Sequence, residues 1–379
     1  MASAEVKVPW IEAVEREPWT VGPKRVLALF RWNGAAFMAL MEMSDSMGEG
    51  MARGFVTAEE VAKRAGVSRS AVSRTFTPGA SVSQSVRRKV LKAARELGYR
   101  VNRLAQGLNN DRSNLIGVVG ANLSSPFISK QLDLLSIGLL RKGLQCLLLN
   151  AADARKDIAP LIELLFEFRA QAIVVLSGEP PESIVDQCIA NGVRLILINQ
   201  KLERTDTSMV LSDDSRGADL AAVRLIEAQC KKVAVISSGS QTPAQVRRAT
   251  AFKQKMATAG VEVVAWSGGP TSYESGYQAG CEVLKDEAID GAFCVTDLLA
   301  LGFLDAARTE MHRRIPADLS VVGFDDIPQA SWKSYELTTV AQSFTALTDH
   351  VLAALDSDDA ETRLRVVPVA MVERKTARR

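Results

Sequence analysis

The stretch Thr57-Ala-Glu-Glu-Val-Ala-Lys-Arg-Ala-Gly-Val-Ser-Arg-Ser-Ala-Val-Ser-Arg-Thr-Phe76 has the pattern of two short helices joined by a tight turn. Thr57 and Glu60 have the spacing of a capping box, so we expect a helix to begin at Thr57. Gly66 can end that helix, because glycine adopts a left-handed conformation without steric cost. Ser68 can cap a second helix two residues later. The stretch therefore predicts a helix-turn-helix.

A third helix is expected to begin after Ser83 and to end near Gly98. Apolar residues recur along it at helical spacing and form a candidate buried stripe, made of Val86, Val90, Leu91 and Leu97. The apolar residues of the first two helices are small, as closely crossing helices require; they are Val61, Ala62, Ala65, Val67 and Val72. We therefore predict an all-α domain over residues 55–101.

The charge of this region indicates a nucleic-acid partner. Residues 53–112 contain 13 Lys and Arg against four Asp and Glu, a local charge of +9 in a chain whose total is +2. A basic module on a mildly acidic remainder is typical of a protein with one DNA-facing part. The candidate DNA contacts are Thr57, at the start of the first helix, and donors on or beside the second helix, namely Ser68, Arg69, Ser70, Ser73 and Arg74. A basic helical bundle without a nucleic-acid role remains the alternative on these residues alone.

The composition excludes several classes of protein. Five cysteines are scattered without a Cys-x-x-Cys pair and there are only two histidines, so we expect no metal site and no disulfide framework. Such cysteines suit a reducing compartment, here the cytoplasm. No apolar run approaches 18 residues, so no membrane segment is predicted. No nucleophile–base pair or metal cluster is visible, so we expect neither an enzyme nor a cofactor.

From residue 113 onward, short apolar runs alternate with helical stretches. This alternation predicts α/β architecture, with doubly wound parallel sheets covered by helices on both faces. Strands are expected at 115–120, 144–149, 172–176, 194–198, 232–236, 261–265, 291–295 and 320–324. Because ligands of such sheets bind beyond the carboxyl ends of the strands, a ligand site is expected there.

Several motifs occur in one order and register along residues 55–376. They are Gly66-Val-Ser-Arg-Ser-Ala-Val-Ser-Arg74, Leu97-Gly-Tyr-Arg-Val-Asn-Arg-Leu-Ala-Gln-Gly-Leu108, Ser125-Pro-Phe127, Thr296-Asp-Leu-Leu-Ala-Leu-Gly302, Ile315-Pro-Ala-Asp-Leu-Ser-Val-Val-Gly-Phe-Asp-Asp326 and Leu337-Thr-Thr-Val-Ala-Gln342. Together they resemble the lactose-repressor (LacI/GalR) family of transcriptional regulators. The resemblance implies a helix-turn-helix headpiece, a hinge, and a periplasmic-binding-protein-like core of two doubly wound subdomains with an effector between them.

The resemblance also implies a domain plan. The headpiece is expected at 55–101, the hinge at 102–112, and a core for effector binding and dimerisation at 113–376. Within the core, one subdomain is expected at about 113–211 and 340–366, and the other at about 212–339 and 367–376. Residues 1–50 match no motif. We hypothesise that translation starts at or near Met51, and a genuine accessory segment is the alternative.

Candidate site residues follow position by position from the family motifs. In the hinge they are Asn102, Ala105 and Leu108, with Leu108 as the side chain that would wedge into the minor groove. In the effector cleft they are Phe127, Asn199, Arg248, Thr271, Thr296 and Asp325. The fork of Arg248 suits a carboxylate, a phosphate or vicinal hydroxyls. Asn199 and Thr271 depart from the family, where an Asp and a stacking aromatic are common.

Neighbouring residues are expected to have other roles. Arg247 is predicted to be solvated, and Asp326 to cap the helix that follows it. Asp297 is assigned a cap or a support behind the ligand as readily as a ligand contact. Two roles remain for Tyr273: it either replaces the missing aromatic ring or lies at the surface.

Taken with the resemblance, the sequence predicts a cytoplasmic, homodimeric repressor of transcription. Its partners would be double-stranded DNA with a near-palindromic operator and a small, sugar-like effector, with no membrane contact. The class of the effector remains open between a sugar, a sugar acid, a polyol and a nucleobase-like metabolite. Two other functions also remain open, a ligand-independent DNA-binding regulator with a degenerate cleft and an enzyme on a doubly wound scaffold.

Overall fold

A computed structural model describes residues 55–77, 79–101, 113–151, 158–177, 180–202, 204, 206–356 and 363–379. The chain divides into two compact units, 1–102 and 103–379, which we describe separately. The predictions for residues 1–50 and for the hinge residues Asn102, Ala105 and Leu108 lie outside the described residues.

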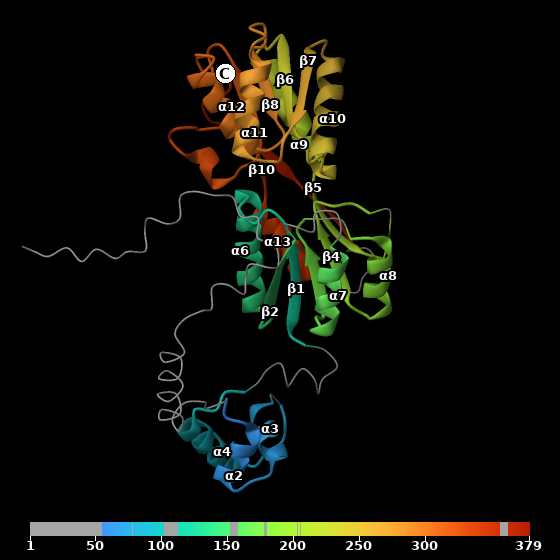
Figure 1. Ribbon diagram of the computed structural model, residues 1–379, viewed down its shortest axis with the longest axis vertical. Coiled ribbons are helices and arrows are strands. Elements are labelled where there is room, and N and C mark those ends of the chain that lie inside the picture. Colours follow the sequence, from blue (N-terminus) through green and yellow to red (C-terminus); the bar gives the residue numbers. More distant parts are fainter. Residues whose placement is uncertain are drawn as a thin grey trace, which may run out of the picture. The chain divides into compact units, whose positions relative to one another are not determined.

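The first unit contains the three predicted helices, α2 (Ala58–Ala65), α3 (Arg69–Phe76) and α4 (Gln84–Leu97) (Figure 1). The capping box is present, since Glu60 N donates to Thr57 Oγ1 at 3.3 Å and Thr57 N donates to the Glu60 carboxylate at 2.6 Å. Gly66 ends α2 in the left-handed region, with φ 65°. Ser68 and Ser83 cap α3 and α4. The helix-turn-helix prediction is confirmed.

The small core of this unit lies where the three helices meet. Val61, Val72 and Val90 are fully buried in it. The prediction for Leu91 is wrong, because its side chain is 37% exposed. Ala93 and Ala94 are buried instead: they lie three and four residues beyond Val90 and so share its helix face, whereas Leu91 points about 100° away.

The second unit contains two six-stranded sheets. The first has the order β11-β5-β4-β3-β1-β2 and is parallel throughout. Its strands are β1 (Leu115–Gly120), β2 (Gln145–Asn150), β3 (Ala172–Val175), β4 (Arg194–Ile198), β5 (Ser208–Ser212) and β11 (Leu364–Val367). The second has the order β12-β10-β9-β8-β6-β7, with only β12 antiparallel to its neighbour. Its strands are β6 (Lys232–Ser238), β7 (Glu262–Gly268), β8 (Gly291–Cys294), β9 (Ser320–Asp325), β10 (Thr338–Gln342) and β12 (Val369–Val372).

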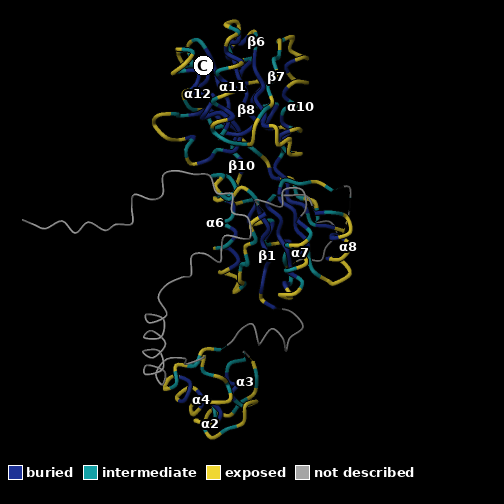
Figure 2. Tube along the Cα trace, viewed as in Figure 1, coloured by how far each residue is buried: buried dark blue, intermediate teal, exposed yellow. Residues whose placement is uncertain are grey.

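Helices cover both faces of each sheet, so the central strands are buried (Figure 2). On the first sheet, α6 (Pro126–Arg141) and α13 (Phe344–Ala354) pack on one face, and α7 (Ala159–Glu167) and α8 (Glu182–Ala190) on the other. We call the first sheet with these four helices the first subdomain. The second subdomain is the second sheet with α9 (Asp214–Glu227), α10 (Pro243–Thr258), α11 (Tyr273–Val283), α12 (Asp297–Thr309) and the short η2 (Pro328–Ser331). The predicted doubly wound fold is confirmed.

The chain passes between the sheets three times. These crossovers run from β5 into α9, from β10 into α13, and from β11 into β12. β10 stays in the second sheet to Gln342, two residues past the expected subdomain boundary at 340. All eight predicted strands are present, with ends that agree to within three residues. The prediction did not include β5, β10, β11 and β12. These strands have only four or five residues, and β5, β10 and β11 also carry Ser, Thr or Arg within them.

Helices α11 and α12 approach each other unusually closely, which fixes the start of α12 at the carboxyl edge of the sheet. A Cβ added to Gly302 would lie 1.9 Å from Tyr273 O, and one added to Gly276 would lie 2.0 Å from Leu299 O. Both positions therefore require glycine. Among the described residues, no helix is both long and apolar enough to cross a membrane.

Candidate functional site

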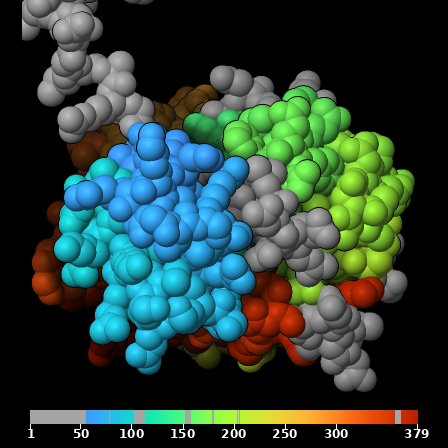
Figure 3. Space-filling model, turned by 90° about the horizontal axis from the view of Figure 1, so that it is seen from below, coloured from blue at the N-terminus to red at the C-terminus, as the bar shows by residue number. Residues whose placement is uncertain are grey.

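Helix α3 presents one face of hydrogen-bond donors to solvent. Val72 and Thr75 are buried against the other helices, and the residues between them point outward. The exposed side chains at the start and on the outer face of α3 are Ser68, Arg69, Ser70, Ser73 and Arg74. Figure 3 shows the surface of this unit in blue and cyan. These donors lie on one face of a short helix, the arrangement a recognition helix needs in a major groove.

The sequence-predicted DNA contacts differ in how much of their bonding capacity is used within the protein. Among the described partners, Arg74 donates only through its Nε, to Ser70 O at 3.3 Å. Ser68 Oγ accepts from Ala71 N at 3.2 Å and lies 2.9 Å from Ser70 Oγ. Thr57 is engaged in the capping box, where its hydroxyl also donates to the Glu60 carboxylate at 2.9 Å. Its structural task is therefore to start α2.

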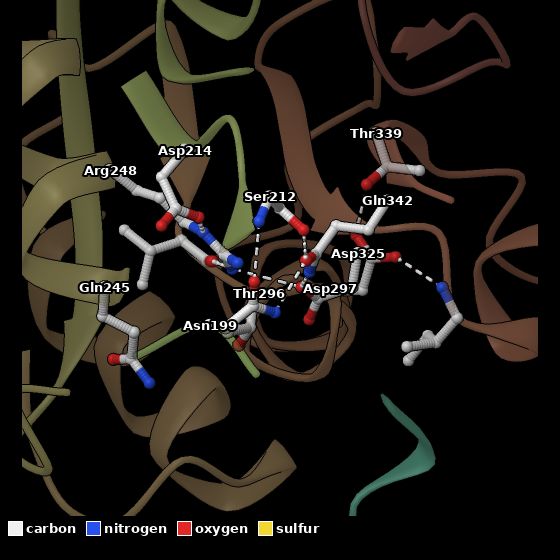
Figure 4. A network of polar contacts seen from close by, with 12 residues as sticks. Asn199, Ser212, Asp214, Gln245, Arg248, Thr296, Asp297, Asp325, Thr339 and Gln342 are labelled. Atoms are coloured by element: carbon white, nitrogen blue, oxygen red, sulfur yellow. Dashed lines mark hydrogen bonds and ion pairs between the residues drawn. The ribbon is translucent and has the colours of Figure 1, made fainter. Parts of the chain in front are cut away.

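In the core, a buried polar network lies between the two subdomains (Figure 4). Its centre is Arg248, on α10, which is 3% exposed. The Nε atom donates to Asp214 Oδ1 at 2.7 Å, and Nη1 donates to Val295 O at 2.9 Å and Asp325 Oδ1 at 3.1 Å. The guanidinium carbon lies 3.7 Å from the centre of the Phe324 ring. Arg248 is thus held by two carboxylates and an aromatic face.

Asp325, the last residue of β9, is the second member of this network. It has φ 127°, an uncommon backbone conformation for a residue with a side chain. Burial raises the pKa of Asp325, and the Arg248 charge and the hydrogen bond from Gln342 oppose that shift. Among the described residues, Asp325 Oδ2 and Arg248 Nη2 have no hydrogen-bond partner. The pair therefore retains one acceptor and one donor.

Asn199 follows β4 in the first subdomain, and all of its polar groups are bonded within the protein, including its main-chain N–H, which donates to Val210 O at 2.9 Å. Its Nδ2 donates to Gln342 Oε1 at 3.1 Å, and its Oδ1 accepts from Ser212 N at 2.8 Å. Its main-chain O accepts from Arg247 Nη2 at 3.4 Å. Its φ of 56° is left-handed, a conformation that asparagine tolerates. The residue therefore positions other side chains.

Thr271 and Thr296 are both engaged in local structure. Thr271 Oγ1 lies 2.8 Å from Ser238 Oγ and accepts from Gln245 Nε2 at 2.9 Å. Thr296 caps α12 by accepting from Leu299 N at 3.5 Å. A polar cluster thus occupies the place where the family resemblance implies a stacking ring.

Asp297, directly after Thr296, is fully buried and acts inside the protein. Its carboxylate accepts from Ile327 N at 3.0 Å and from the Thr339 hydroxyl. Burial, with the Asp325 charge nearby, raises the pKa of Asp297. It supports the β9–η2 turn behind the Arg248–Asp325 pair.

Phe127, at the start of α6, supplies the apolar side of the region. It packs against the cores of both subdomains. Its ring centre lies 5.1 Å from that of Phe344, the first residue of α13, with the planes inclined by 42°. The two rings together form a larger apolar surface than the one predicted from Phe127 alone.

Two neighbouring predictions are wrong. Arg247 is not simply solvated, because it forms an ion pair with Asp214 at 2.7 Å. Asp326 does not cap the next helix; its carboxylate instead accepts from Arg374 Nη2 at 2.6 Å. Tyr273 donates to Asp305 at 2.7 Å, away from the Thr271 cluster, so it does not replace the missing ring.

Sequence reasoning missed several residues of the network. They are Asp214, Gln245, Gln342 and Phe344. Gln342 ends a quoted motif, which was the only signal for it. Gln200 was also missed: both polar atoms of its amide are buried and have no partner among the described residues. A buried unpaired amide is costly, so it indicates a place for a ligand or ordered water.

Comparison with known proteins gives matches in both units. The family "Bacterial regulatory proteins, lacI family" matches residues 57–102, and "Periplasmic binding protein-like domain" matches residues 222–377. The transcriptional repressor PurR of Proteus mirabilis is 27% identical over 335 residues, which are 84% of this chain and 96% of PurR.

Two solved structures extend the match. The lac repressor dimer bound to operator and the anti-inducer ONPF has a TM-score of 0.75 at 24% identity, over 85% of this chain and 99% of that one. The complex of the regulator CelR with cellobiose has a TM-score of 0.60 at 26% identity, over 85% and 100%. Both units, their order and the fold agree, and the matched relatives are regulators rather than enzymes. The chain is a DNA-binding transcription regulator and belongs to the lacI family of bacterial regulatory proteins.

Proposed function

We propose that this protein represses transcription by binding a near-palindromic operator as a homodimer, and that a neutral, hydroxyl-rich effector in the core cleft controls its operator affinity. The donor face of α3 supports major-groove contact, and the local charge of +9 supports binding to the phosphate backbone. The relative PurR carries the description of a repressor, which supports the direction of control.

The observation that carries the effector proposal is the Arg248–Asp325 pair with its remaining Nη2 donor and Oδ2 acceptor. A donor and an acceptor side by side suit a hydroxyl pair. The cluster is electrically balanced, because the charges of Arg247 and Arg248 match those of Asp214 and Asp325. A charged effector would disturb that balance in a buried place, which favours a neutral one.

The same region supports control through closure of the cleft. Phe127 belongs to the first subdomain, whereas Arg248 and Asp325 belong to the second. A ligand that touches both sides favours the conformation in which both contacts are made. The difference in the ligand's binding free energy between the two conformations is then available to change operator affinity.

An apolar surface on the first subdomain supports pairing with a second copy. On α6, Leu140 is 73% exposed and Ile137 is 40% exposed, and Leu148 lies on the edge strand β2. A two-fold dimer through such a surface would present two α3 helices to the two halves of a palindrome.

The proposal is tested by selecting DNA duplexes in vitro with the full chain, then screening neutral sugars, polyols and sugar acids by thermal shift. We expect a near-palindromic consensus and a stabilising ligand among the neutral compounds. The ligand should lose its effect with Asp325→Asn. Stabilisation by sugar acids alone would contradict the neutral-effector proposal.

A ligand-independent regulator is the second candidate. It is favoured by the mutual pairing of Asn199, Gln342, Asp325 and Arg248, which satisfies most of the polar groups of the cleft without a ligand. Failure of every compound in the screen, together with tight duplex binding, would support this candidate.

A further inference from the structure

Six residues of the core close a ring of hydrogen bonds. Starting from Asn199, the contacts run through Gln342, Asp325, Arg248, Asp214 and Arg247 and return to the main-chain O of Asn199. Two of the contacts join the first subdomain to the second, namely those from Asn199 to Gln342 and from Arg247 to Asn199. Every bond of the ring is made between protein groups.

The bond from Asn199 to Gln342 has a defined direction. Gln342 Oε1 accepts from Asn199 Nδ2 and from the Ser212 hydroxyl, while its Nε2 donates to Asp325 Oδ1 at 2.6 Å. A carboxylate can only accept from this amide, so the nitrogen must face Asp325 and the oxygen must face Asn199. Only a donor at residue 199 satisfies this orientation, and Asn provides one.

The second contact depends on Arg247. Its Nε and Nη2 donate to Asp214 Oδ2 at 3.1 and 2.7 Å, and Nη2 also reaches Asn199 O at 3.4 Å. The Asp214 side chain is 1% exposed and carries both arginines. The forked guanidinium of Arg247 therefore holds a buried carboxylate of its own subdomain and the strand end of the other subdomain together.

We propose that Asn199, Arg247 and Asp214 form a latch that holds the two subdomains together in the ligand-free protein. The latch lies beside the Arg248–Asp325 pair and leaves its free donor and acceptor unused. It sets the resting balance between closed and open cores, on which any effector must act. The inference concerns the ligand-free core, so it stands independently of the effector class.

The latch predicts a measurable change in that balance. Losing one net hydrogen bond between two states shifts their ratio by on the order of 2- to 10-fold. Arg247→Gln removes the charge and shortens the side chain. Arg247→Lys keeps the charge opposite Asp214, but the lysine side chain is shorter and ends before the position of Nη2, whose contact with Asn199 O is already 3.4 Å long. Asn199→Gly removes both side-chain bonds and still accepts the left-handed backbone at this position.

The test measures the distance between the subdomains in the full chain without ligand, by electron–electron double resonance. Nitroxides are attached at Ser183→Cys on α8 and Ser240→Cys before α10, both exposed, after the partly exposed Cys146 and Cys281 are replaced by alanine. Labelled chain is diluted with unlabelled chain, so that any assembly carries one labelled copy. Lys253→Gln, an exposed change on α10, is the matched control.

The wild type and the Lys253→Gln control are expected to give the same, predominantly single distance. Arg247→Gln, Arg247→Lys and Asn199→Gly should each increase a second population at a different distance, by 2- to 10-fold in ratio. If Arg247→Gln and Asn199→Gly match the wild type, the latch is overturned. The latch is equally overturned if Arg247→Lys gives the same distances as the wild type. The ion pair with Asp214 would then hold the core closed without the contact to Asn199 O. Arg247→Lys retains a positive charge opposite the buried Asp214, so the fold should stay intact for the comparison.

Discussion

The guanidinium carbon of Arg248 lies 3.7 Å from the centre of the Phe324 ring, and the guanidinium donates to Asp325, the next residue along the strand. One strand end therefore supplies both an aromatic face and a carboxylate to the same cation. The attraction between a cation and an aromatic face is stronger when the cation is desolvated, and here the arginine is almost completely buried. The arginine is consequently a structural member of the core as well as a candidate effector contact.

Replacement of Arg248 by alanine should destabilise the core strongly. Breaking a buried ion pair by removing one partner costs about 3–5 kcal/mol, because the remaining charge stays buried and unpaired. Here two carboxylates, Asp214 and Asp325, would be left. Urea unfolding of the full chain measures the loss, with the exposed Lys255→Ala on the same helix as the control. A loss below about 1 kcal/mol would mean that water replaces the guanidinium freely.

The stability of the core should depend on pH through Asp297. Burial raises the pKa of this carboxyl in the folded state, so the neutral form is favoured by folding. Its contribution is complete at pH values below the pKa of the unfolded chain and is lost as the pH rises through the folded value. Asp297→Asn should therefore gain stability relative to the wild type between about pH 5 and pH 8. Denaturant midpoints at several pH values test this, and a constant difference would contradict the raised pKa.

Substituting Thr57 separates helix capping from DNA contact. Thr57→Ala removes the two bonds of the Thr57 hydroxyl, those with Glu60 N and with the Glu60 carboxylate, and leaves the main-chain N–H of residue 57 able to donate to Glu60. Loss of an N-cap side chain costs about 0.5–2 kcal/mol of stability. We expect a lower melting temperature of the headpiece and an unchanged sequence preference. Selection of duplexes with the variant would show an altered consensus if the hydroxyl instead contacts a base.

Arg69 is expected to read a base, because it is exposed at the first turn of α3. Arg69→Ala should lose about 1–3 kcal/mol of discrimination at one position of the half-site, whereas loss of a phosphate contact weakens all sequences alike. Affinities for a set of single-base operator variants measure the difference. Lys92→Ala, on the exposed face of α4, is a control for general loss of positive charge. Equal weakening at every position would assign Arg69 to the backbone.

The helix ends could be predicted because they depend on nearby residues. Side-chain pairs between distant parts of the chain could not be predicted. Thr57, Gly66 and Gly98 act through residues three or four positions away, so their roles are visible in the sequence. Arg247 and Asp326 were misjudged because their partners, Asp214 and Arg374, lie 33 and 48 residues away. The short strands at the crossovers were missed for a related reason, since their neighbours come from remote parts of the chain.

The cleft shows the same division. Motif matching placed Arg248 and Asp325 within the polar network, and they do contact each other. It did not reveal that Asn199 would be occupied by protein partners, because this depends on the direction of the Gln342 amide. Residue type at a matched position therefore predicts location better than it predicts bonding.

The position of β11 and β12 in the chain governs the order in which this protein can be built. Residues 364–367 complete the edge of the first sheet, and residues 369–372 complete the edge of the second. Thr376 follows them and is bonded to Thr338 N at 2.9 Å inside the second sheet. Both subdomains therefore acquire these edge strands only after residues 364–372 have left the ribosome. The headpiece can fold during synthesis, while the core must wait, and a stop codon near residue 360 would damage both subdomains at once.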